Sequence, residues 1–492
     1  MAAARGVIAA GHPQTAAAGA EVLRAGGNAV DAAVAAVLAS FACEPLLTGL
    51  AAGGYMLVAL DGERTLLDFF VEAPGRGADP AARGELVPID VSFGDAIQVF
   101  NVGPASVGTY GTPAGLAEAA RRFGRLALSD LAAPAVELAR EGVVVNATQA
   151  YVIEILGDIA VSTPEVAALF APDGRLLREG DVYRNPDLAE ALVRLGAEGP
   201  APFYSGDIAA AVVEWLDGRG AMLTAQDLAE YEAVARSPVC VSYRGREVLT
   251  NPPPSAGGTL IAYAMALLER SVAAPDVAQL VGVMEKAQHE RTPEFLEGLS
   301  DAGFLDRFLA SRLGSTTHIS VLDGDGNACG VTCSNGEGSG IVVPGTGLHL
   351  NNMLGEQDLN PLGFHRHPAG RRMPSMMCPT VVMREGAPEL VLGSGGSNRI
   401  RSAILQTIVN LVDRGLPVDE AVRAPRVHIE EGVVYAEPGV DTHELENTGH
   451  TIARFRDVNL FFGGVHAVAR DFATGELSGG GDPRRGGSVR TA

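Results

Sequence analysis

Two adjacent threonines at the start of a predicted strand are the residues best suited to chemistry. The segment Gly314-Ser315-Thr316-Thr317-His318 is followed by the apolar and polar alternation typical of a β-strand. If the peptide bond before Thr316 is cut, a free α-amine and a hydroxyl group share one residue. Such an amine has a pKa of about 7.7–8, so near pH 7 part of it is neutral and can activate the weakly nucleophilic hydroxyl group. Taken alone, a threonine pair at a strand start is more often only a strand former.

A glycine-rich turn is the second candidate. The segment Gly393-Ser394-Gly395-Gly396-Ser397-Asn398-Arg399 follows an apolar strand and precedes a helix predicted over 401–412. Backbone amides in such a turn can point into a concavity, and the helix N-terminus adds positive potential. The arrangement suits the oxyanion of acyl transfer, and equally a phosphate, although it lacks the pattern of a P-loop or a dinucleotide fingerprint. The alternative is a plain strand-to-helix turn.

Polar residues in three further segments could complete a site. Ser334 follows a predicted strand and could place its hydroxyl group beside Thr316 from a neighbouring strand. Asn352 and Glu356 offer an amide and a carboxylate, and Ser375 offers another hydroxyl group. Each segment alone could equally be a loop or a strand end. The histidines are dispersed and form no evident metal-binding set, so no metal is expected.

Composition narrows the classes of partner and the compartment. The chain has 492 residues, of which 47% are hydrophobic, and a net charge of −22, so we expect a globular protein without nucleic acid or anionic membrane partners. Its five cysteines indicate no disulfide framework, and Cys329 and Cys333 are predicted to be buried rather than zinc ligands. The N-terminus does not resemble a signal peptide and no apolar run is long enough to span a membrane, so a cytoplasmic location is expected.

The order of predicted elements favours a layered α+β fold. Strands are predicted at 53–60 and 65–70, joined by an Asp61-Gly62 turn, and the region 113–310 reads as mostly helical. Strands and glycine turns return after Gly314. Strands from both ends of the chain must find partners, so we expect both segments to share one core.

The chain resembles the γ-glutamyltransferase family of N-terminal-nucleophile hydrolases over nearly its whole length. The matching motifs, in chain order, are His12-Pro13, Ala25-Gly26-Gly27-Asn28, Glu44-Pro45, Gly53-Gly54-Tyr55-Met56, Gly111-Thr112-Pro113, Pro252-Pro253-Pro254-Ser255, Thr316-Thr317-His318, Cys378-Pro379-Thr380, Ala424-Pro425-Arg426 and Asp482-Pro483-Arg484. So many matches in order leave little room for chance.

The resemblance implies a four-layer αββα sandwich made from a precursor that cleaves itself before Thr316. Residues 1–315 would form a large subunit and residues 316–492 a small one, associated as a heterodimer with one shared core. Whether this heterodimer dimerises further is left open.

The resemblance also implies the roles of single residues. Thr316 would be the nucleophile and, through its new amine, the base, while Ser334 would take the place of a family threonine that hydrogen-bonds to it. The amides of Gly396 and Ser397 would form the oxyanion hole. The enzyme would transfer an acyl group from a small-molecule amide to water or to an amine acceptor, without a metal or an organic cofactor.

The predicted substrate pocket departs from the family at one decisive position. Family members usually carry an arginine in an Arg-Glu-x-Ala-Pro segment, where it holds the α-carboxylate of a glutamyl group, whereas this chain has Val71 there. A charge-assisted hydrogen bond contributes roughly 1.5–3 kcal/mol, so its loss should weaken binding of glutamyl substrates about tenfold to a hundredfold or more. Arg76 lies nearby in the sequence and could substitute.

Other predicted substrate-binding positions are partly changed. Asn352 is retained and Glu356 could still meet an α-ammonium group, but Met353 replaces a polar residue. One of the family's paired serines remains as Ser375 and the other has become a methionine.

The sequence therefore predicts an amide-hydrolysing enzyme of this family whose acyl group need not be γ-glutamyl. Two alternatives stay open. One is a related acylase or amidohydrolase, of the cephalosporin-acylase or oxamate-amidohydrolase kind. The other is a non-enzymic relative that remains uncut and binds a small acid.

Overall fold

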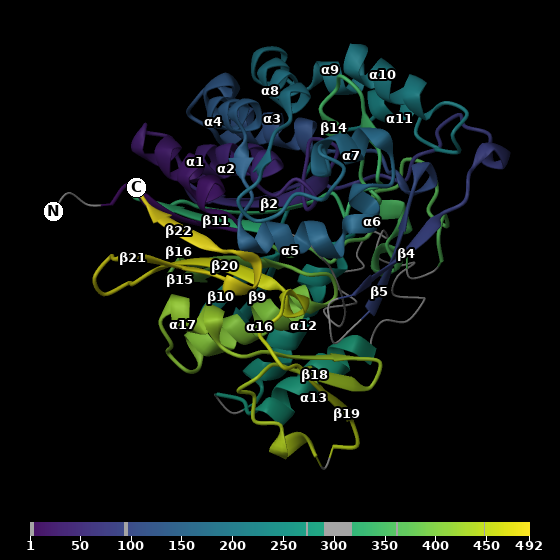
Figure 1. The fold of residues 1–492 in the computed structure, drawn as a ribbon. Coiled ribbons are helices and arrows are strands. Elements are labelled where there is room, and N and C mark those ends of the chain that lie inside the picture. The colour runs from purple at the N-terminus through teal and green to yellow at the C-terminus, as the bar shows by residue number, and fades with distance from the viewer. Residues whose placement is uncertain (1–3, 93–96, 272–273, 290–316, 361–362, 447) are drawn as a thin grey trace.

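Two large β-sheets lie face to face between two layers of helices (Figure 1). The computed structural model describes residues 4–92, 97–271, 274–289, 317–360, 363–446 and 448–492. The first sheet has the strand order β22 (Ser488–Thr491), β1 (Gly6–Ala10), β11 (Thr317–Asp323), β12 (Ala328–Ser334), β2 (Gly53–Leu60), β3 (Glu63–Phe69) and β8 (Val234–Arg236). The second has the order β21 (Leu477–Gly481), β20 (Gly464–Arg470), β16 (Ala387–Gly395), β15 (Thr380–Arg384), β10 (Arg246–Thr250) and β9 (Val239–Tyr243). The predicted αββα sandwich is confirmed.

One helical layer covers the outer face of the first sheet (Figure 1). It contains α1 (Pro13–Arg24), α2 (Ala29–Cys43), α3 (Thr112–Phe123), α4 (Leu128–Glu141) and α8 (Pro186–Glu198). Every residue of α2 is buried, because its alanine- and valine-rich surface packs against helices on one side and against β11 and β12 on the other. A capping box between Asn28 and Asp31 fixes its first turn.

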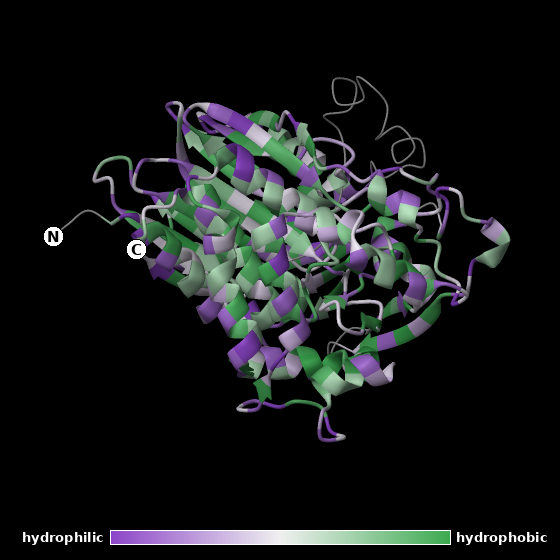
Figure 2. Cartoon of the chain, turned by 90° about the horizontal axis from the view of Figure 1, so that it is seen from above, coloured by the Kyte–Doolittle hydropathy of each residue, from purple (hydrophilic) through white to green (hydrophobic). Residues whose placement is uncertain are grey.

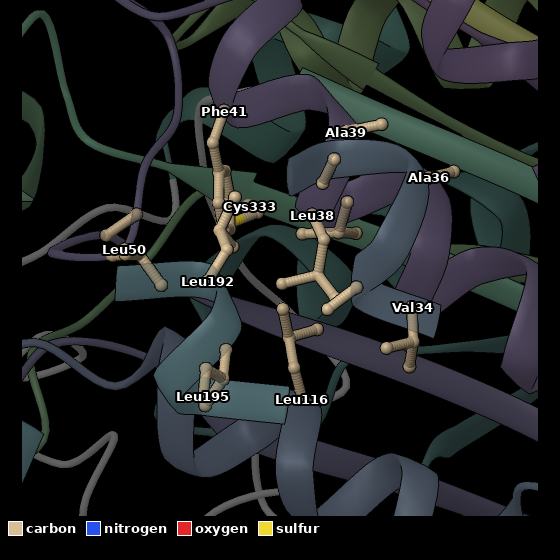
Figure 3. Close-up of a cluster of buried hydrophobic side chains, with 14 of the residues drawn as sticks. Val34, Ala36, Leu38, Ala39, Phe41, Leu50, Leu116, Leu192, Leu195 and Cys333 are labelled. Atoms are coloured by element: carbon tan, nitrogen blue, oxygen red, sulfur yellow. The ribbon is translucent and has the colours of Figure 1, made fainter. Parts of the chain in front are cut away.

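The core beneath these helices is built from small and branched side chains. Figure 3 shows Leu38, Leu116, Leu192 and Cys333 in one cluster that joins helices to β12. Cys329 and Cys333 are both buried, as predicted.

The second helical layer covers the second sheet (Figure 1) and consists of α12 (Ala256–Glu269), α13 (Val277–His289), α16 (Arg399–Val412) and α17 (Val418–Arg423). The predicted helix 401–412 thus begins two residues earlier, at Arg399. Figure 2 shows that stretches of hydrophobic residues run along the central elements, while many of the outer loops are hydrophilic.

Shorter elements surround the sandwich. They are β4 (Val87–Ser92), β5 (Ile97–Val102), β6 (Val143–Val144), α5 (Ala147–Ile155), α6 (Gly157–Ala160), α7 (Pro164–Phe170), β7 (Val182–Tyr183), α9 (Ala201–Tyr204), α10 (Asp207–Leu216), α11 (Ala225–Ala229), β13 (Val342–Val343), β14 (Leu348–His349), β17 (Val427–Glu430), β18 (Val433–Ala436) and β19 (Thr451–Arg454). Among the described residues, no helix combines the length and apolarity needed to cross a membrane.

The segments before residue 290 and after residue 316 both contribute strands to both sheets. β1 lies between β11 and β22, and β10 pairs with β15. An apolar cluster between the sheets likewise takes side chains from early and late segments; it includes Val7, Leu57, Leu249, Val391 and Val468. The proposed boundary between residues 315 and 316 lies outside the described residues.

Candidate active site

A pocket opens where β11 begins and β12 ends. Thr317 is the first residue of β11 and pairs with Cys333, so Thr317 and Ser334 lie at the same end of the two antiparallel strands. Both line the pocket, whose wall is formed by Leu47, Gln98, Phe100, Val152, Ile155, Leu156, Thr317, Ser334, Gly336, Glu337, Glu356, Gly396, Ser397, Arg399, Leu460 and Arg485. The predicted nucleophile, Thr316, lies outside the described residues and immediately precedes Thr317 in the chain.

His318 fixes β11 against the second sheet. Its Nε2 and the Ser320 Oγ are 2.8 Å apart, and the Ser320 hydroxyl group donates to the His466 carbonyl oxygen at 2.9 Å. Because that hydroxyl proton is used, Nε2 must donate and Nδ1 accepts from Thr332 Oγ1 at 2.7 Å. Burial lowers the pKa of His318 well below its usual value, so the ring is neutral.

Gly393 makes this position of the ring possible. A Cβ atom at residue 393 would lie only 2.3 Å from His318 Nδ1. The imidazole therefore occupies the space that a side chain on β16 would fill, and it ties the start of β11 to the strand that leads into the glycine-rich turn.

The glycine-rich turn presents two backbone amides at the pocket. Gly396 and Ser397 both have positive φ, 116° and 53°, and neither N–H group donates to a backbone acceptor within the described part of the chain. Asp358 holds the turn, since its carboxylate accepts from Ser397 Oγ and from Asn398 Nδ2, the latter at 2.8 Å. The turn thus has the form of an anion-binding nest at the N-terminus of α16.

Two buried carboxyl groups, those of Glu337 and Glu356, form one wall of the pocket. Burial raises the pKa of Glu337 to about 7, and burial together with the nearby Glu337 raises the pKa of Glu356 well above its usual value. Asn352 supports this wall, because its Oδ1 accepts from the Glu337 backbone N–H at 2.9 Å.

Glu44 lies beneath the start of β11. Its carboxylate accepts from the hydroxyl groups of Thr317, at 3.2 Å, and Thr15, at 3.3 Å. Burial raises the pKa of Glu44 to about 7. Gly11 leaves the necessary room, since a Cβ atom there would lie 2.4 Å from Glu44 Oε2.

The pocket also contains two arginines. Arg399 donates from Nε to the Phe461 carbonyl oxygen at 2.9 Å and from Nη2 to Gln98 Oε1 at 3.3 Å. Arg485 lies close to the glycine-rich turn, because its Nη2 is 3.4 Å from the place where a Cβ atom of Gly396 would stand. Across the described ranges, no group of three or more His, Cys, Asp and Glu side chains is arranged to hold a metal ion.

Comparison with known proteins decides the family. The model of the family described as gamma-glutamyltranspeptidase matches residues 15–492. This chain belongs to the γ-glutamyltranspeptidase family.

The similar proteins include two kinds of enzyme. The acylase ACY 1 proenzyme of Pseudomonas sp. strain SE83 is 32% identical over 94% of this chain and 90% of its own length. The glutathione hydrolase proenzyme of Escherichia coli K12 is 32% identical over 83% of this chain and 78% of its own length. Among solved structures, the cephalosporin acylase from Bacillus halodurans superposes with a TM-score of 0.85 at 28% identity, covering 99% of this chain and 96% of its own.

The chain is thus a γ-glutamyltranspeptidase-type enzyme with the N-terminal-nucleophile hydrolase fold. This finding gives no support to the alternative of a non-enzymic binder.

Within this γ-glutamyltranspeptidase framework, the structure brings some predicted site residues together. Ser334, Glu356, Gly396 and Ser397 all line one pocket. Asn352 is not among the lining residues, but its Oδ1 accepts a hydrogen bond from the backbone N–H of Glu337, which does line the pocket.

Three other predicted substrate-binding residues are not among the described residues that line the pocket. Val71 and Met353, which were predicted to line the pocket, instead pack in the apolar cluster between the sheets, where burial removes their apolar surface from water. Ser375 is buried, and its Oγ accepts from the Met377 N–H at 3.0 Å.

Arg76 does not face the pocket either. Its guanidinium group forms ion pairs with Glu72, Asp227 and Glu230 at 2.9 to 3.4 Å. Three carboxylates therefore hold it away from the position where a substitute for the missing family arginine would be needed.

Sequence reasoning missed Glu44, Glu337 and Arg485 as site residues. Only weak signals could have found them: Glu337 follows Ser334 closely, and Arg485 comes directly after the Asp482-Pro483-Arg484 motif. Glu44 belongs to the Glu44-Pro45 motif but reaches Thr317 only through the packing of α2 under β11.

Proposed function

We propose that this chain is an amide hydrolase and acyltransferase that cuts its own peptide bond between Ser315 and Thr316 and then forms an acyl-enzyme on Thr316. The observation that carries the proposal is the pocket at the start of β11, where Thr317, Ser334 and the Gly396-Ser397 turn meet. The names of the relatives as proenzymes are consistent with such processing.

Ser334 is suited to orient the nucleophile. Thr317 pairs with Cys333 in an antiparallel ladder. If this register continues by one residue, Thr316 lies opposite Ser334. Ser334 Oγ already accepts from the Gly336 N–H at 2.9 Å. The hydroxyl proton of Ser334 is therefore available for a hydrogen bond to Thr316 Oγ.

The proposed reaction has two balanced halves. The Thr316 amine takes the hydroxyl proton as Oγ adds to the substrate carbonyl carbon, and the N–H groups of Gly396 and Ser397 stabilise the oxyanion. The C–N bond then breaks, the leaving amine takes the proton, and an ester remains on Thr316. Water then attacks the ester carbonyl carbon, the bond to Thr316 Oγ breaks, Oγ regains its proton and the acid is released. If an amine acceptor attacks in place of water, the product is a new amide.

The acyl group is proposed to differ from γ-glutamyl. Val71 is in the core and Arg76 is occupied by three carboxylates, so neither position supplies the family's carboxylate-binding arginine. A γ-glutamyl substrate remains the second candidate, because Glu337 and Glu356 line the pocket and can bind an ammonium group when ionised.

Intact-mass analysis together with an anilide assay tests the proposed function. The wild-type chain should separate into fragments 1–315 and 316–492 under denaturing conditions and should hydrolyse at least one acyl anilide. Thr316→Ala should remain one polypeptide without turnover, while the control Thr451→Ala, at an exposed strand position, should behave as wild type. Normal hydrolysis by Thr316→Ala would overturn the proposal.

A further inference from the structure

Arg485 supplies a guanidinium group that lines the pocket without a protein partner. Within the described residues, no hydrogen bond or ion pair engages this group, and its Nε is buried without an acceptor. Arg399, the other arginine of the pocket, donates from Nε and Nη2 to protein oxygens. Buried polar groups in native proteins are nearly always paired, so an open guanidinium in a pocket indicates an anionic ligand group.

The backbone and the side-chain stem hold Arg485 in place. Its neighbour Arg484 forms ion pairs with Glu437 at 2.5 Å and with Asp482 at 3.1 Å. The stem of Arg485 lies against the backbone of Gly464, where a Cβ atom would stand only 2.3 Å from Arg485 Cδ. Gly464 therefore allows the stem to cross β20, and the far end of the side chain reaches Gly396.

The charged groups around Arg485 are already engaged elsewhere. Asp482 pairs with Arg426 at 2.6 Å and with Arg484.

The two nearby acids, Glu44 and Glu337, make their hydrogen bonds to threonine hydroxyl groups and to Asn352, respectively. Burial and the like charge of Arg399 lower the pKa of Arg485 to about 10, so the group is still cationic near neutral pH. A bound anion would offset the repulsion between the two arginines.

We propose that Arg485 binds a carboxylate on the acyl part of the substrate, and that the preferred substrates are amides of short dicarboxylic acids. The inference rests on the proposed function and names its substrate class. The carboxylate is assigned to the acyl part because Arg485 Nη2 lies beside Gly396, whose backbone amide is proposed to hold the oxygen of the acyl carbonyl group. The chain is short because Nη2 lies beside Gly396, so a bound carboxylate is only a few bonds from the carbonyl group at the turn.

Paired substrates separate carboxylate binding from general catalysis. Self-processed wild-type enzyme is assayed with malonyl, succinyl and glutaryl p-nitroanilides and with the methyl ester of each. At least one acid should exceed its ester in kcat/KM by about tenfold to a hundredfold, as expected for one charge-assisted hydrogen-bonded pair. Arg485→Gln should bring that ratio close to one, because the acid loses the partner of its carboxylate and the ester has no carboxylate to lose.

Three outcomes overturn the inference. One is a wild-type enzyme without preference for any acid over its ester. Another is an equal loss of acid and ester turnover in Arg485→Gln, which would place the guanidinium group on the oxyanion. The third is loss of the preference in Arg76→Gln together with its retention in Arg485→Gln.

A second measurement does not depend on the folding of a variant. Of malonamic, succinamic and glutaramic acids, at least one should inhibit the wild-type enzyme at least tenfold more strongly than the corresponding diamide, and equal inhibition within all three pairs would overturn the inference. Failure of the proposed function is distinguishable: it would appear as a chain that is never cut before Thr316 and hydrolyses no anilide, ester or acid. Turnover of the esters without preference for the acids defeats only the role of Arg485.

Discussion

The Asp358 carboxylate accepts from two successive residues of the glycine-rich turn. Its contacts are Ser397 Oγ and Asn398 Nδ2, directly beyond Gly396. An asparagine at position 358 would keep one acceptor oxygen and replace the other by an NH2 group, so the Ser397 hydroxyl group would have to accept instead of donate and both contacts would lose their charged acceptor.

We expect Asp358→Asn to lower kcat about tenfold or more and to change KM little, because the variant disturbs the amides that face the transition state rather than the substrate-binding wall. Steady-state kinetics measure this split. Asp457→Asn, at an exposed position, is the matched control and should match wild type. An unchanged kcat in Asp358→Asn would show that the turn keeps its conformation without the carboxylate.

Glu44 makes stability depend on pH in a direction opposite to that of the buried histidines. Below pH 4.5 its carboxyl group is protonated in both folded and unfolded chains. Between pH 4.5 and about 7 the unfolded chain releases this proton while the folded chain keeps it, so the free energy of unfolding falls by up to about 3 kcal/mol. Buried His318 has a lowered pKa and instead costs stability as the pH falls below 6.5.

Comparing variants isolates the contribution of Glu44. Relative to wild type, Glu44→Gln should gain about 3 kcal/mol in the free energy of unfolding as the pH rises from 4.5 to above 7, because glutamine cannot ionise. Urea titrations at several pH values measure the difference. The exposed Glu444→Gln should show no such trend, and a constant difference for Glu44→Gln would contradict the assigned titration.

Site residues placed by local sequence patterns could be predicted, whereas those placed by long-range packing could not. Ser334, Gly396 and Ser397 were predictable because local strand and turn patterns place them. Glu44 contacts Thr317 across 273 residues of sequence, and only the packing of α2 under β11 creates that contact. Val71 was expected at the pocket by its place in a motif, but an apolar side chain gains more from burial in the core than from contact with a polar pocket wall.

At the scale of elements, His318 couples β11 to β16 and β20. The ring occupies the space beside Gly393, and Ser320 continues the contact to the His466 carbonyl oxygen. This contact fixes the first residue of β11 relative to the turn that follows β16.

Gly393→Ala should destabilise the fold by about 1–3 kcal/mol, as overpacking of a close-packed core does. The matched control is Gly282→Ala in α13, where no atom would lie within 4 Å of the added Cβ, and where alanine should stabilise the helix by roughly 0.5–1 kcal/mol. Thermal or urea denaturation distinguishes the two. Equal stability of the two variants would mean that the His318 ring can move aside at little cost.

Local sequence patterns predicted the long strands better than the short ones. The β2–β3 hairpin with its Asp61-Gly62 turn is confirmed, because alternation and turn chemistry are encoded locally. The strands β8, β9 and β10 were missed inside the region read as mostly helical. These strands have only three to five residues, too few for a period to stand out, and pairing with β3 and β15 stabilises them.

At the scale of the whole molecule, the segments before residue 290 and after residue 316 are interleaved. β1 is hydrogen-bonded on both sides to strands of the later segment, and the Arg5 N–H donates to the Ala492 carbonyl oxygen at 2.8 Å. Neither segment alone contains a complete first sheet or a complete apolar layer between the sheets.

Cleavage before Thr316 should therefore leave one folded body. The fragments 1–315 and 316–492 should elute together in native size-exclusion chromatography and separate only in denaturant, because dissociation would expose the edges of β11 and β1 and the cluster between the sheets. Each fragment expressed alone should lack a cooperative unfolding transition, whereas co-expression of the two should restore it. A cooperative transition of 1–315 alone would show that the early segment closes its own core, and the shared-core description would then fail.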